Sequence, residues 1–457
     1  MSYDPTTAEY LSFSDARRSF ASGTDTPRAY LDRCLARIAE LEPKVQAFVI
    51  VDIKGAQAAA DAATARWKAG RPLSNVDGMP VGIKDCFDVR DFVTACNSPL
   101  FADNVAQLDA AHVDALRRGG AEIVGKTVTT ELTMALPGPT WNPWDLERTP
   151  GGSSSGSAAA VAARMLPLAT GSQVRGSVLR PASICGVVGM KPTFGAINRS
   201  GGIDPSPSCN HLGFLAGTLT DAWETAHYLA SVAGGDPGYP SLAGGEKLPA
   251  PRKPARVGVQ YTAGWQHTDD VSKDLFREFL RALTARDIEV VEPNVSEEFA
   301  SYEDATARTP EFFFDVMLWE IRWPFRLWRE MYPERLSEPM AGYIARAEQM
   351  MPEDYARALR RREDLRRRHR ALRGKVDCFV SLAHIGPGQR GQPRGGTPWY
   401  NDPSSAIGAP SFSLPILATE NVPLGIQIVG FEGEDEALAA ISRRMLDDFG
   451  SQTVGPG

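Results

Sequence analysis

The chain has 457 residues, of which 43% are hydrophobic and 23% charged, and its formal net charge is −7. This composition is that of a folded globular protein and excludes disordered and fibrous classes. The acidic balance argues against a nucleic-acid-binding protein, which usually carries a basic face. No stretch reaches the ~18 consecutive apolar residues that a membrane span needs.

The N-terminus lacks the charged and apolar regions of a secretory signal. The six cysteines are scattered, with no metal-ligand spacing, and are typical of free buried thiols in a reducing compartment. We therefore expect a cytoplasmic protein, a monomer or homodimer, with no membrane or nucleic-acid partner.

The first part of the chain alternates helical and strand-like patterns. Thr26 is a plausible N-cap with Pro27 at the first helical position. In chain order, the expected elements are a helix to about Leu41, a strand Ala47–Val51, a helix Lys54–Gly70, a strand Met79–Lys84, a helix Asp109–Gly119 and a strand Glu122–Lys126. The alternation predicts an α/β fold, with a large mixed, mostly parallel sheet covered by helices on both faces.

The second part contains further strands and a long basic helix. The expected elements are strands Arg256–Val259, Val376–Leu382, Phe412–Ile416 and Leu424–Val429, and helices Tyr355–Arg373 and Asp435–Phe449. We find no internal repeat and no low-complexity linker. The chain is predicted to form one domain, residues 1–457, with a helical insertion at about 258–373.

Two segments rich in glycine and serine are the most informative part of the sequence. The first, Pro150–Ser157, runs directly into the alanine-rich stretch Ala158–Ala163. The second, Gly171–Ser177, is followed by Arg180-Pro181-Ala182. Such a loop at the start of a helix gathers backbone N–H groups and hydroxyls at a positive helix end.

Several other interpretations of these segments are open. A phosphate-binding loop would need a Gly-Lys-Ser/Thr ending, which is missing. Gly152–Gly156 fits the G-x-S-x-G nucleophile elbow, but an apolar strand should precede an elbow, and Trp144–Thr149 is polar. Both segments could also be glycine turns that merely pack.

Several segments in the right order resemble the amidase signature family. The matching segments are Asp77–Asp85, Pro150–Ser157 and Gly171–Pro192, with weaker landmarks at Asn142–Asp145 and Pro423–Gly430. The resemblance covers nearly the whole chain, and it implies the amidase signature fold.

Residue by residue, the resemblance implies a Ser-Ser-Lys catalytic triad: Ser177 is the nucleophile, Ser153 the bridging serine and Lys84 the base. Ser153 precedes Ser177 by 177 − 153 = 24 positions, the spacing of the family. In that family the bridging serine follows a cis peptide bond. The backbone N–H groups of Val174, Arg175, Gly176 and Ser177 would form the oxyanion hole.

The chemistry is consistent with this assignment. A serine hydroxyl needs a base to become a nucleophile, and none of the six histidines lies next to a serine motif. Lys84 ends an apolar strand, and burial could lower its pKa enough for it to act as the base. Alternatively, Lys84 is a buried structural lysine paired with Asp85. The mechanism requires no metal and no cofactor.

The nucleophile segment departs from the family pattern. Gln173, Val174, Arg175 and Leu179 stand where the family has Asp, Thr, Gly and Arg. Because all three catalytic positions remain, we interpret this as altered surroundings of an active site. Arg175 either shapes the pocket or points to solvent.

A second departure lies at Asn210–Phe214, where the family tends to have Asp and Gly-Pro. We interpret His211 in this segment as a hydrogen-bonded loop residue and not as a catalyst.

The substrate pocket is predicted to involve the loop Thr127–Trp141, with Thr133, Met134 and Trp141 as substrate-binding residues. The aromatic stretch Phe312–Tyr332 either walls the entrance or packs in the core. We expect hydrolysis of small or medium neutral amides, with aryl or acyl amides favoured, and of carbamates such as urethanes. The alternatives are an amidotransferase subunit that releases ammonia from glutamine or asparagine for tRNA-linked synthesis, and a non-catalytic binding protein on the same scaffold.

Overall fold

A computed structural model describes residues 2–391 and 395–450 of the chain. Its core is one sheet of 11 strands in the order β1-β3-β2-β4-β6-β5-β10-β11-β9-β7-β8. The strands are β1 (Phe48–Val51), β2 (Pro80–Lys84), β3 (Glu122–Thr127), β4 (Leu168–Gln173), β5 (Val188–Lys191), β6 (His211–Ala216), β7 (Arg256–Val259), β8 (Glu289–Val291), β9 (Cys378–Leu382), β10 (Ser411–Thr419) and β11 (Val422–Val429).

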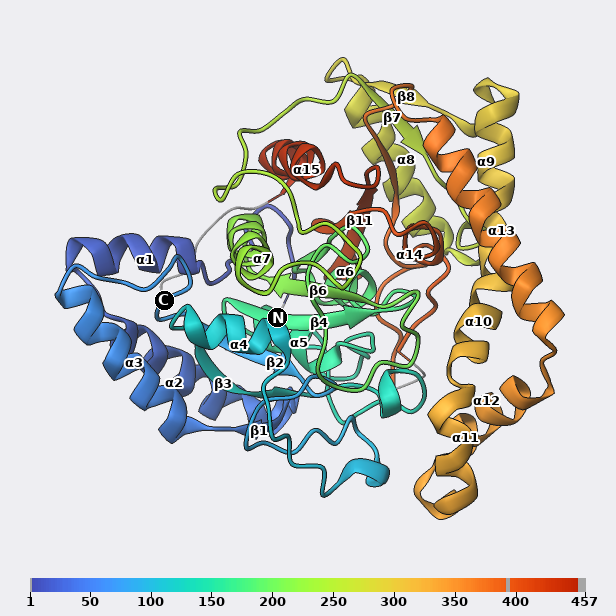
Figure 1. Ribbon diagram of the computed structural model, residues 1–457. Coiled ribbons are helices and arrows are strands. Elements are labelled where there is room, and N and C mark those ends of the chain that lie inside the picture. Colours follow the sequence, from blue (N-terminus) through green and yellow to red (C-terminus); the bar gives the residue numbers. More distant parts are fainter. Residues whose placement is uncertain (1, 392–394, 451–457) are drawn as a thin grey trace.

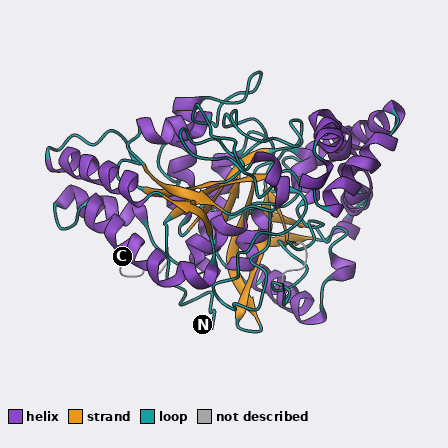
Figure 2. Ribbon diagram, turned by 90° about the horizontal axis from the view of Figure 1, so that it is seen from below, coloured by secondary structure: helices purple, strands orange, loops and turns teal. Residues whose placement is uncertain are grey.

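Helices cover this sheet, and Figure 2 shows the strands in the interior with helices on both sides. In the first half the helices are α1 (Phe13–Ser22), α2 (Pro27–Val45), α3 (Ile53–Lys68), α4 (Ala111–Arg118), α5 (Ser155–Ala162), α6 (Leu179–Cys185) and α7 (Leu219–Ala233). In the second half they are α8 (Asp270–Thr284), α9 (Glu297–Ala307), α10 (Thr309–Glu320), α11 (Arg322–Met331), α12 (Glu338–Gln349), α13 (Pro352–Ala371), α14 (Asp402–Ile407) and α15 (Asp435–Phe449). The predicted large mixed α/β sheet is confirmed.

The sheet is less parallel than the sequence predicts. Four of its strand pairings are parallel, namely β2–β3, β2–β4, β7–β8 and β7–β9. The other six are antiparallel. One physical reason is local: β10 and β11 are joined by the two residues Glu420 and Asn421, both at positive φ, and so short a connection permits only an antiparallel hairpin.

Most predicted elements are present with small shifts at their ends. Thr26 caps α2 by accepting a hydrogen bond from the Ala29 N–H, and Pro27 is the first helical residue. Strand β4 is the main difference, because the sequence indicates a turn at Gly171, Ser172 and Gln173, which are strand residues. Its composition of small residues suits a strand that is buried along its whole length.

The segment predicted as a helical insertion, 258–373, holds α8 to α13 but also part of β7 and all of β8. It therefore extends the sheet as well as adding helices. Helices α9 to α13 lie together on one side of the molecule, at the right of Figure 1. In the part of the chain that the structure describes, no helix is long and apolar enough to cross a membrane.

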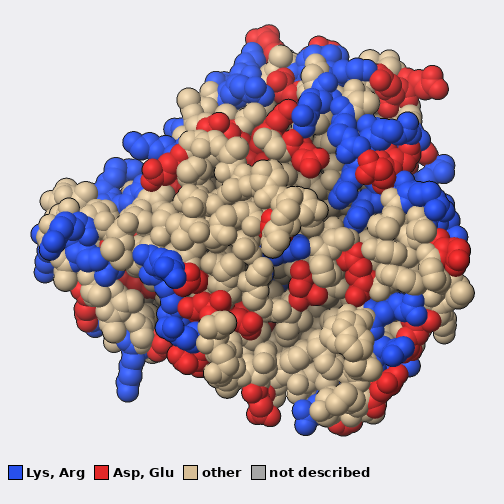
Figure 3. All heavy atoms as spheres, in the orientation of Figure 1, with Lys and Arg blue, Asp and Glu red and all other residues tan. Residues whose placement is uncertain are grey.

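The long helix α13 carries the basic run that the sequence shows. Its arginines form ion pairs with acidic side chains of the same helix, such as Arg370 with Glu363 and Arg368 with Asp364. In Figure 3 acidic and basic side chains are interspersed near α9 and α13, while the middle of this face is mostly uncharged. The prediction of a solvated helix face agrees with this arrangement.

Candidate active site

The predicted base is at the end of a central strand. Lys84 is the last residue of β2, which pairs in parallel with β4. Parallel neighbours end at the same edge of the sheet, so Lys84 lies beside the last residues of β4. The Lys84 side chain is fully buried, with an exposed fraction of 0%.

Three groups surround the Lys84 ammonium nitrogen. Its Nζ is 2.7 Å from Ser153 Oγ, 2.9 Å from Ser172 Oγ and 3.3 Å from the Ser172 carbonyl oxygen. Burial lowers the pKa of Lys84 from 10.5 to about 8. A neutral amine can donate two hydrogen bonds and accept one. The Ser172 carbonyl oxygen can only accept, whereas either serine hydroxyl can donate to the amine, so these three partners can satisfy the neutral form of Lys84.

The structure argues against the alternative that Lys84 is held by Asp85. Asp85 Oδ1 instead pairs at 2.9 Å with Nζ of Lys126, on the neighbouring strand β3. Asp85 Oδ2 accepts a hydrogen bond from the Cys96 N–H. Within the described residues Lys84 has no ion-pair partner, and this leaves its amine free to take a proton from a hydroxyl.

Ser153 lies in the first glycine-serine loop, just before α5. The peptide bond between Gly152 and Ser153 is cis, as the family resemblance implies. The Arg180 guanidinium holds this loop, with Nε 3.0 Å and Nη2 2.6 Å from the Gly152 carbonyl oxygen. The Ser154 N–H donates to the Ser177 carbonyl at 3.2 Å and so joins the two glycine-serine segments.

Ser177 sits in the turn between β4 and α6. Gln173 holds this turn, because its Oε1 accepts the Val178 and Leu179 N–H groups at 2.9 and 3.0 Å. A neutral amide thus organises the turn at the position where the family has an Asp. At Gly176 a Cβ atom would lie 2.6 Å from Asn401 Oδ1, so the turn has no room for a side chain there.

The backbone of this turn presents hydrogen-bond donors. Among the described residues, no acceptor is found for the N–H groups of Val174, Arg175, Gly176 and Ser177. Free N–H groups next to a nucleophile can stabilise the oxyanion that forms when a carbonyl is attacked. The predicted oxyanion hole is therefore geometrically available.

Ser153, Ser172 and Ser177 open into one cavity of about 170 Å³. Its other lining residues are Thr130, Thr133, Met134, Ala135, Val174, Arg175, Arg180, Phe314, Met317, Tyr343, Gly395, Gly396 and Pro398. Two of the predicted substrate-binding residues, Thr133 and Met134, are among them. Trp141 is not, because the chain turns away before it and the Trp141 N–H bonds to the Val45 carbonyl at the end of α2.

The aromatic residues of the stretch Phe312–Tyr332 are divided between the cavity and the core. Phe314 of α10 lines the cavity, as does Tyr343 of α12, which lies beyond the stretch, whereas Phe313 and Phe325 are buried in the core. Trp323, by contrast, is 68% exposed. The stretch therefore supplies one wall of the site and does not form the entrance as a whole.

Arg175 lines the cavity and does not point freely into solvent. Its Nε and Nη2 bind the two carboxylate oxygens of Asp402 at 2.9 and 2.5 Å. Asp402 is fully buried in α14, and the Arg175 guanidinium also lies 5.1 Å from the centre of the Phe314 ring. The charge of Arg175 is thus compensated inside the protein.

The structure adds to the sequence-based interpretation of two residues. The sequence suggests no function for Ser172, although its hydroxyl contacts Lys84; only the parallel pairing of β2 and β4 reveals that contact. His211 is the first residue of β6 and not a loop residue, and its Nδ1 is 3.0 Å from the Gln173 carbonyl. The interpretation of His211 as a hydrogen-bonded residue agrees with this contact.

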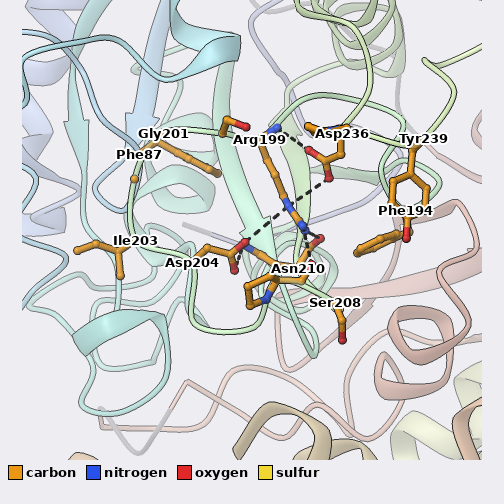
Figure 4. Close-up of a pocket in the computed structure, with 14 residues that line it drawn as sticks. Phe87, Phe194, Arg199, Gly201, Ile203, Asp204, Ser208, Asn210, Asp236 and Tyr239 are labelled. Carbon is orange, nitrogen blue, oxygen red and sulfur yellow. Dashed lines mark hydrogen bonds and ion pairs between the residues drawn. The ribbon is translucent and has the colours of Figure 1, made fainter. Parts of the chain in front are cut away.

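A second cavity, of about 270 Å³, lies apart from the predicted catalytic serines (Figure 4). Arg199 dominates it, with Nε 3.2 Å from Asp236 and 3.6 Å from Asp204. Phe194 and Tyr239 form one side. None of Lys84, Ser153 and Ser177 lines this cavity, whereas both serines line the smaller one. Residues 2–391 and 395–450 contain no group of three His, Cys, Asp or Glu side chains that could hold a metal ion.

Comparisons with known proteins agree with this geometry. The Amidase family profile matches residues 29–439. A glutamyl-tRNA(Gln) amidotransferase subunit of Roseiflexus castenholzii is 31% identical over 94% of each chain. A crystal structure of an amidase has a TM-score of 0.84 at 26% identity, and covers 96% of this chain and 100% of its own.

A further structure, solved in work on a vestigial protein complex and the origins of an s-triazine catabolic enzyme, also has a TM-score of 0.84, at 25% identity. It covers 96% of this chain and 99% of its own. Ordered motifs, the site geometry and a family match over most of the chain lead to one conclusion: this protein belongs to the amidase family and is a hydrolase of carbon–nitrogen bonds.

Proposed function

We propose that this protein hydrolyses small linear amides through an acyl-enzyme on Ser177, with Ser153 and Lys84 as its proton relay. The observation that carries the proposal is the 2.7 Å contact between Ser153 Oγ and a buried lysine that has no carboxylate partner in the described chain. Lysine in this setting can act as a general base near neutral pH.

The reaction begins when Ser177 Oγ attacks the amide carbonyl carbon. The Ser177 proton passes to Ser153 as Ser153 gives its own proton to Lys84. The carbonyl oxygen becomes an oxyanion and takes hydrogen bonds from the free N–H groups of the turn, each worth about 3–4 kcal/mol in other hydrolases.

The relay then runs in reverse. Ser153 protonates the leaving nitrogen and regains a proton from Lys84, so the C–N bond breaks and the amine departs. Water attacks the ester on Ser177 by the same route and releases the acid. Carbamates have the same carbonyl and leaving nitrogen, so they fit the same steps.

The cavity favours a small acyl group. Its volume of about 170 Å³ is below the ~300–1,000 Å³ of pockets for drug-sized ligands. Met134, Phe314, Met317 and Tyr343 give it an apolar side, which suits an uncharged aryl or alkyl amine as leaving group. The preference for neutral aryl or acyl amides and carbamates over glutamine stays a prediction from the sequence.

Labelling of Ser177 tests the catalytic assignment. A fluorophosphonate should form an adduct on the peptide that contains Ser177, and Ser177→Ala should abolish both the adduct and the acyl-enzyme. Mass spectrometry of the folded protein measures both results. An adduct on Ser154 would support the nucleophile elbow instead, and a folded protein without any adduct would support a non-catalytic binding protein.

A second candidate function is the release of ammonia from glutamine within an amidotransferase. The relative from Roseiflexus castenholzii favours it, since that protein is named as part of a glutamyl-tRNA(Gln) amidotransferase and aligns over 94% of this chain. A comparison of kcat/KM for an anilide, an aryl carbamate and glutamine under one set of conditions distinguishes the two functions. The highest value for glutamine would favour the amidotransferase function.

A further inference from the structure

The second cavity carries an excess of negative charge. Its charged lining residues are two carboxylates, Asp204 and Asp236, and one guanidinium, Arg199. No further charged side chain lines it in the part of the chain that the structure describes. One of the two negative charges is therefore left without a partner, and this favours a cationic ligand.

All three nitrogens of the Arg199 guanidinium have partners in the protein. Its Nε lies 3.2 Å from Asp236 Oδ2. Its Nη2 donates at 2.5 Å to the Pro207 carbonyl oxygen, and its Nη1 donates to the carbonyl oxygen of Asn210. These contacts fix Arg199 beside Asp236, so Asp204 is the carboxylate that it leaves uncompensated.

Asp204 has a free oxygen. Its Oδ1 accepts hydrogen bonds from the Ser206 N–H at 3.1 Å and from Asn210 Nδ2 at 3.0 Å. Its Oδ2 accepts none from the described residues and has a long contact of 3.6 Å with Arg199 Nε. Burial raises the pKa of Asp204, and the Glu320 carboxylate adds to this effect. A cation beside Asp204 Oδ2 would offset both causes.

Asn210 supplies a second free acceptor. The residue is 4% exposed, and the bond from its Nδ2 to Asp204 fixes the orientation of the amide and directs Oδ1 away from that carboxylate. No described residue donates a hydrogen bond to Asn210 Oδ1. The same holds for Oδ2 of Asp236, which is 7% exposed. Buried acceptors without a donor are unfavourable, so these oxygens indicate a ligand that carries hydrogen-bond donors.

The free oxygens match a primary ammonium group. Such a group has three N–H donors, no acceptor and one positive charge. Asp204 Oδ2, Asp236 Oδ2 and Asn210 Oδ1 offer three acceptors together with the residual negative charge of the cavity. Ca²⁺ takes about six to eight oxygen ligands, so a metal ion of this kind fits the same oxygens less well.

The rest of the cavity is suited to a hydrocarbon group. In Figure 4 Arg199 and the two carboxylates lie between Phe87 and Ile203 on one side and Phe194 and Tyr239 on the other. All four of these side chains belong to the lining. The volume of about 270 Å³ is just below the ~300–1,000 Å³ of pockets for drug-sized ligands, and it limits the ligand to a small molecule.

We propose that the second cavity binds a small organic primary amine in its protonated form. The ammonium group binds Asp204, Asp236 and Asn210, and the hydrocarbon group lies against the aromatic side chains. This inference is independent of the proposed hydrolase function, because Lys84 and Ser177 do not line this cavity.

Calorimetry with benzylamine and benzyl alcohol tests the charge of the ligand. The two molecules have the same ring, but benzylamine is a cation at pH 7. Benzylamine should bind at least about tenfold more tightly, because a hydrogen bond between charged groups is stronger than a neutral one. Equal affinities, or no binding of benzylamine, overturn the inference. Binding of potassium ion in place of benzylamine, in a parallel titration with potassium chloride, overturns it as well.

Asp204→Asn locates the ammonium group. The variant removes the charge with little change in shape and should weaken benzylamine binding at least about tenfold. The control Asp287→Asn removes the same charge from a side chain that is 97% exposed, and it should leave the affinity unchanged. An unchanged affinity in Asp204→Asn, or an equal loss in the control, contradicts the assignment.

A second pair of variants separates the two cavities. Primary amines are also leaving groups of amide hydrolysis, so binding in the smaller cavity has to be excluded. Tyr239→Ala removes a ring from the second cavity at a residue that is 48% exposed, where the fold should tolerate the change. It should weaken benzylamine binding at least about threefold. Phe314→Ala removes a ring from the smaller cavity and should have no effect. The reverse pattern would place the amine beside the predicted catalytic serines and refute the inference.

Discussion

Two lysines at the ends of neighbouring strands show how the same degree of burial supports different functions. Lys84 ends β2 and Lys126 lies near the end of β3, and both side chains have an exposed fraction of 0%. Lys126 Nζ is 2.9 Å from Asp85 Oδ1, whereas the hydrogen-bond partners of Lys84 Nζ among the described residues are two serine hydroxyls and a carbonyl oxygen. An ion pair keeps a lysine charged and structural; burial without a carboxylate leaves an amine that can act as a base.

A third lysine shows that a lowered pKa alone does not make a lysine a candidate base for a serine. Burial lowers the pKa of Lys191 to about 7. Its Nζ donates to the carbonyl oxygens of Ala409 and Pro192, and none of its partners in the described chain is a hydroxyl. Lys191 therefore has nothing from which it could take a proton. The serine partners, together with burial, distinguish Lys84.

The largest expected effect is that of Lys84→Met on activity. The variant should lose at least about 1,000-fold in kcat/KM, because Ser177 then has no base. It should be no less stable than the wild type at pH 7. The folded-state pKa of about 8 lies below the unfolded value of 10.5, so the unfolded chain holds the proton more tightly. The buried Lys84 therefore lowers the folding stability below about pH 8. This cost disappears as the pH rises from about 8 to 10.5.

Steady-state kinetics and urea unfolding measure both effects. In the wild type, kcat/KM should rise with pH and level off above about 8, where Lys84 is neutral. Lys191→Met is the control, and it should keep its activity within about threefold because Lys191 takes no part in the relay. A pH profile that stays flat down to pH ~5 would exclude a lysine base.

Lys126→Met, unlike Lys84→Met, should lower the folding stability. Removing one partner of a buried ion pair costs about 3–5 kcal/mol of folding stability, because Asp85 is left buried without its cation. The double variant Lys126→Met/Asp85→Asn should recover most of that loss. Urea midpoints of the wild type, both single variants and the double variant give the coupling energy. Additive effects would show that the ion pair contributes no stability.

The smallest effect is expected for Ser172→Ala. The variant removes one hydrogen bond to Lys84 but leaves the Ser153 contact in place. A net loss of ~1 kcal/mol corresponds to about fivefold to tenfold in kcat/KM. Ser153→Ala, measured beside it, should cost far more. Equal losses in the two variants would mean that Ser172, and not Ser153 alone, carries the proton.

The candidate catalytic residues can be named from the sequence because their signals are local in the chain. Ser153 and Ser177 lie in glycine-rich segments whose order and spacing are visible without a structure, and Lys84 ends a clear apolar strand. The helix α15 and the strand β7 also have the predicted bounds, since their patterns are regular.

The rest of the site depends on contacts between distant segments. Asp402 lies 227 positions after Arg175, and its ion pair with that residue has no local signal. The place of Trp141 in a loop predicts that it reaches the pocket, but the direction of that loop is set by a backbone bond to α2. The Ser172 contact requires the pairing of β2 with β4, which periodicity does not specify.

The cavity joins two parts of the chain that are far apart in sequence. Ser153 and Ser177 come from the first half of the chain, whereas Phe314, Tyr343, Gly395, Gly396 and Pro398, which also line the cavity, come from the second half. During synthesis on the ribosome, the two predicted catalytic serines therefore emerge well before the last residues that line their cavity. A half-finished chain therefore contains both serines but lacks part of the cavity lining, so we expect a complete site only when translation is nearly finished.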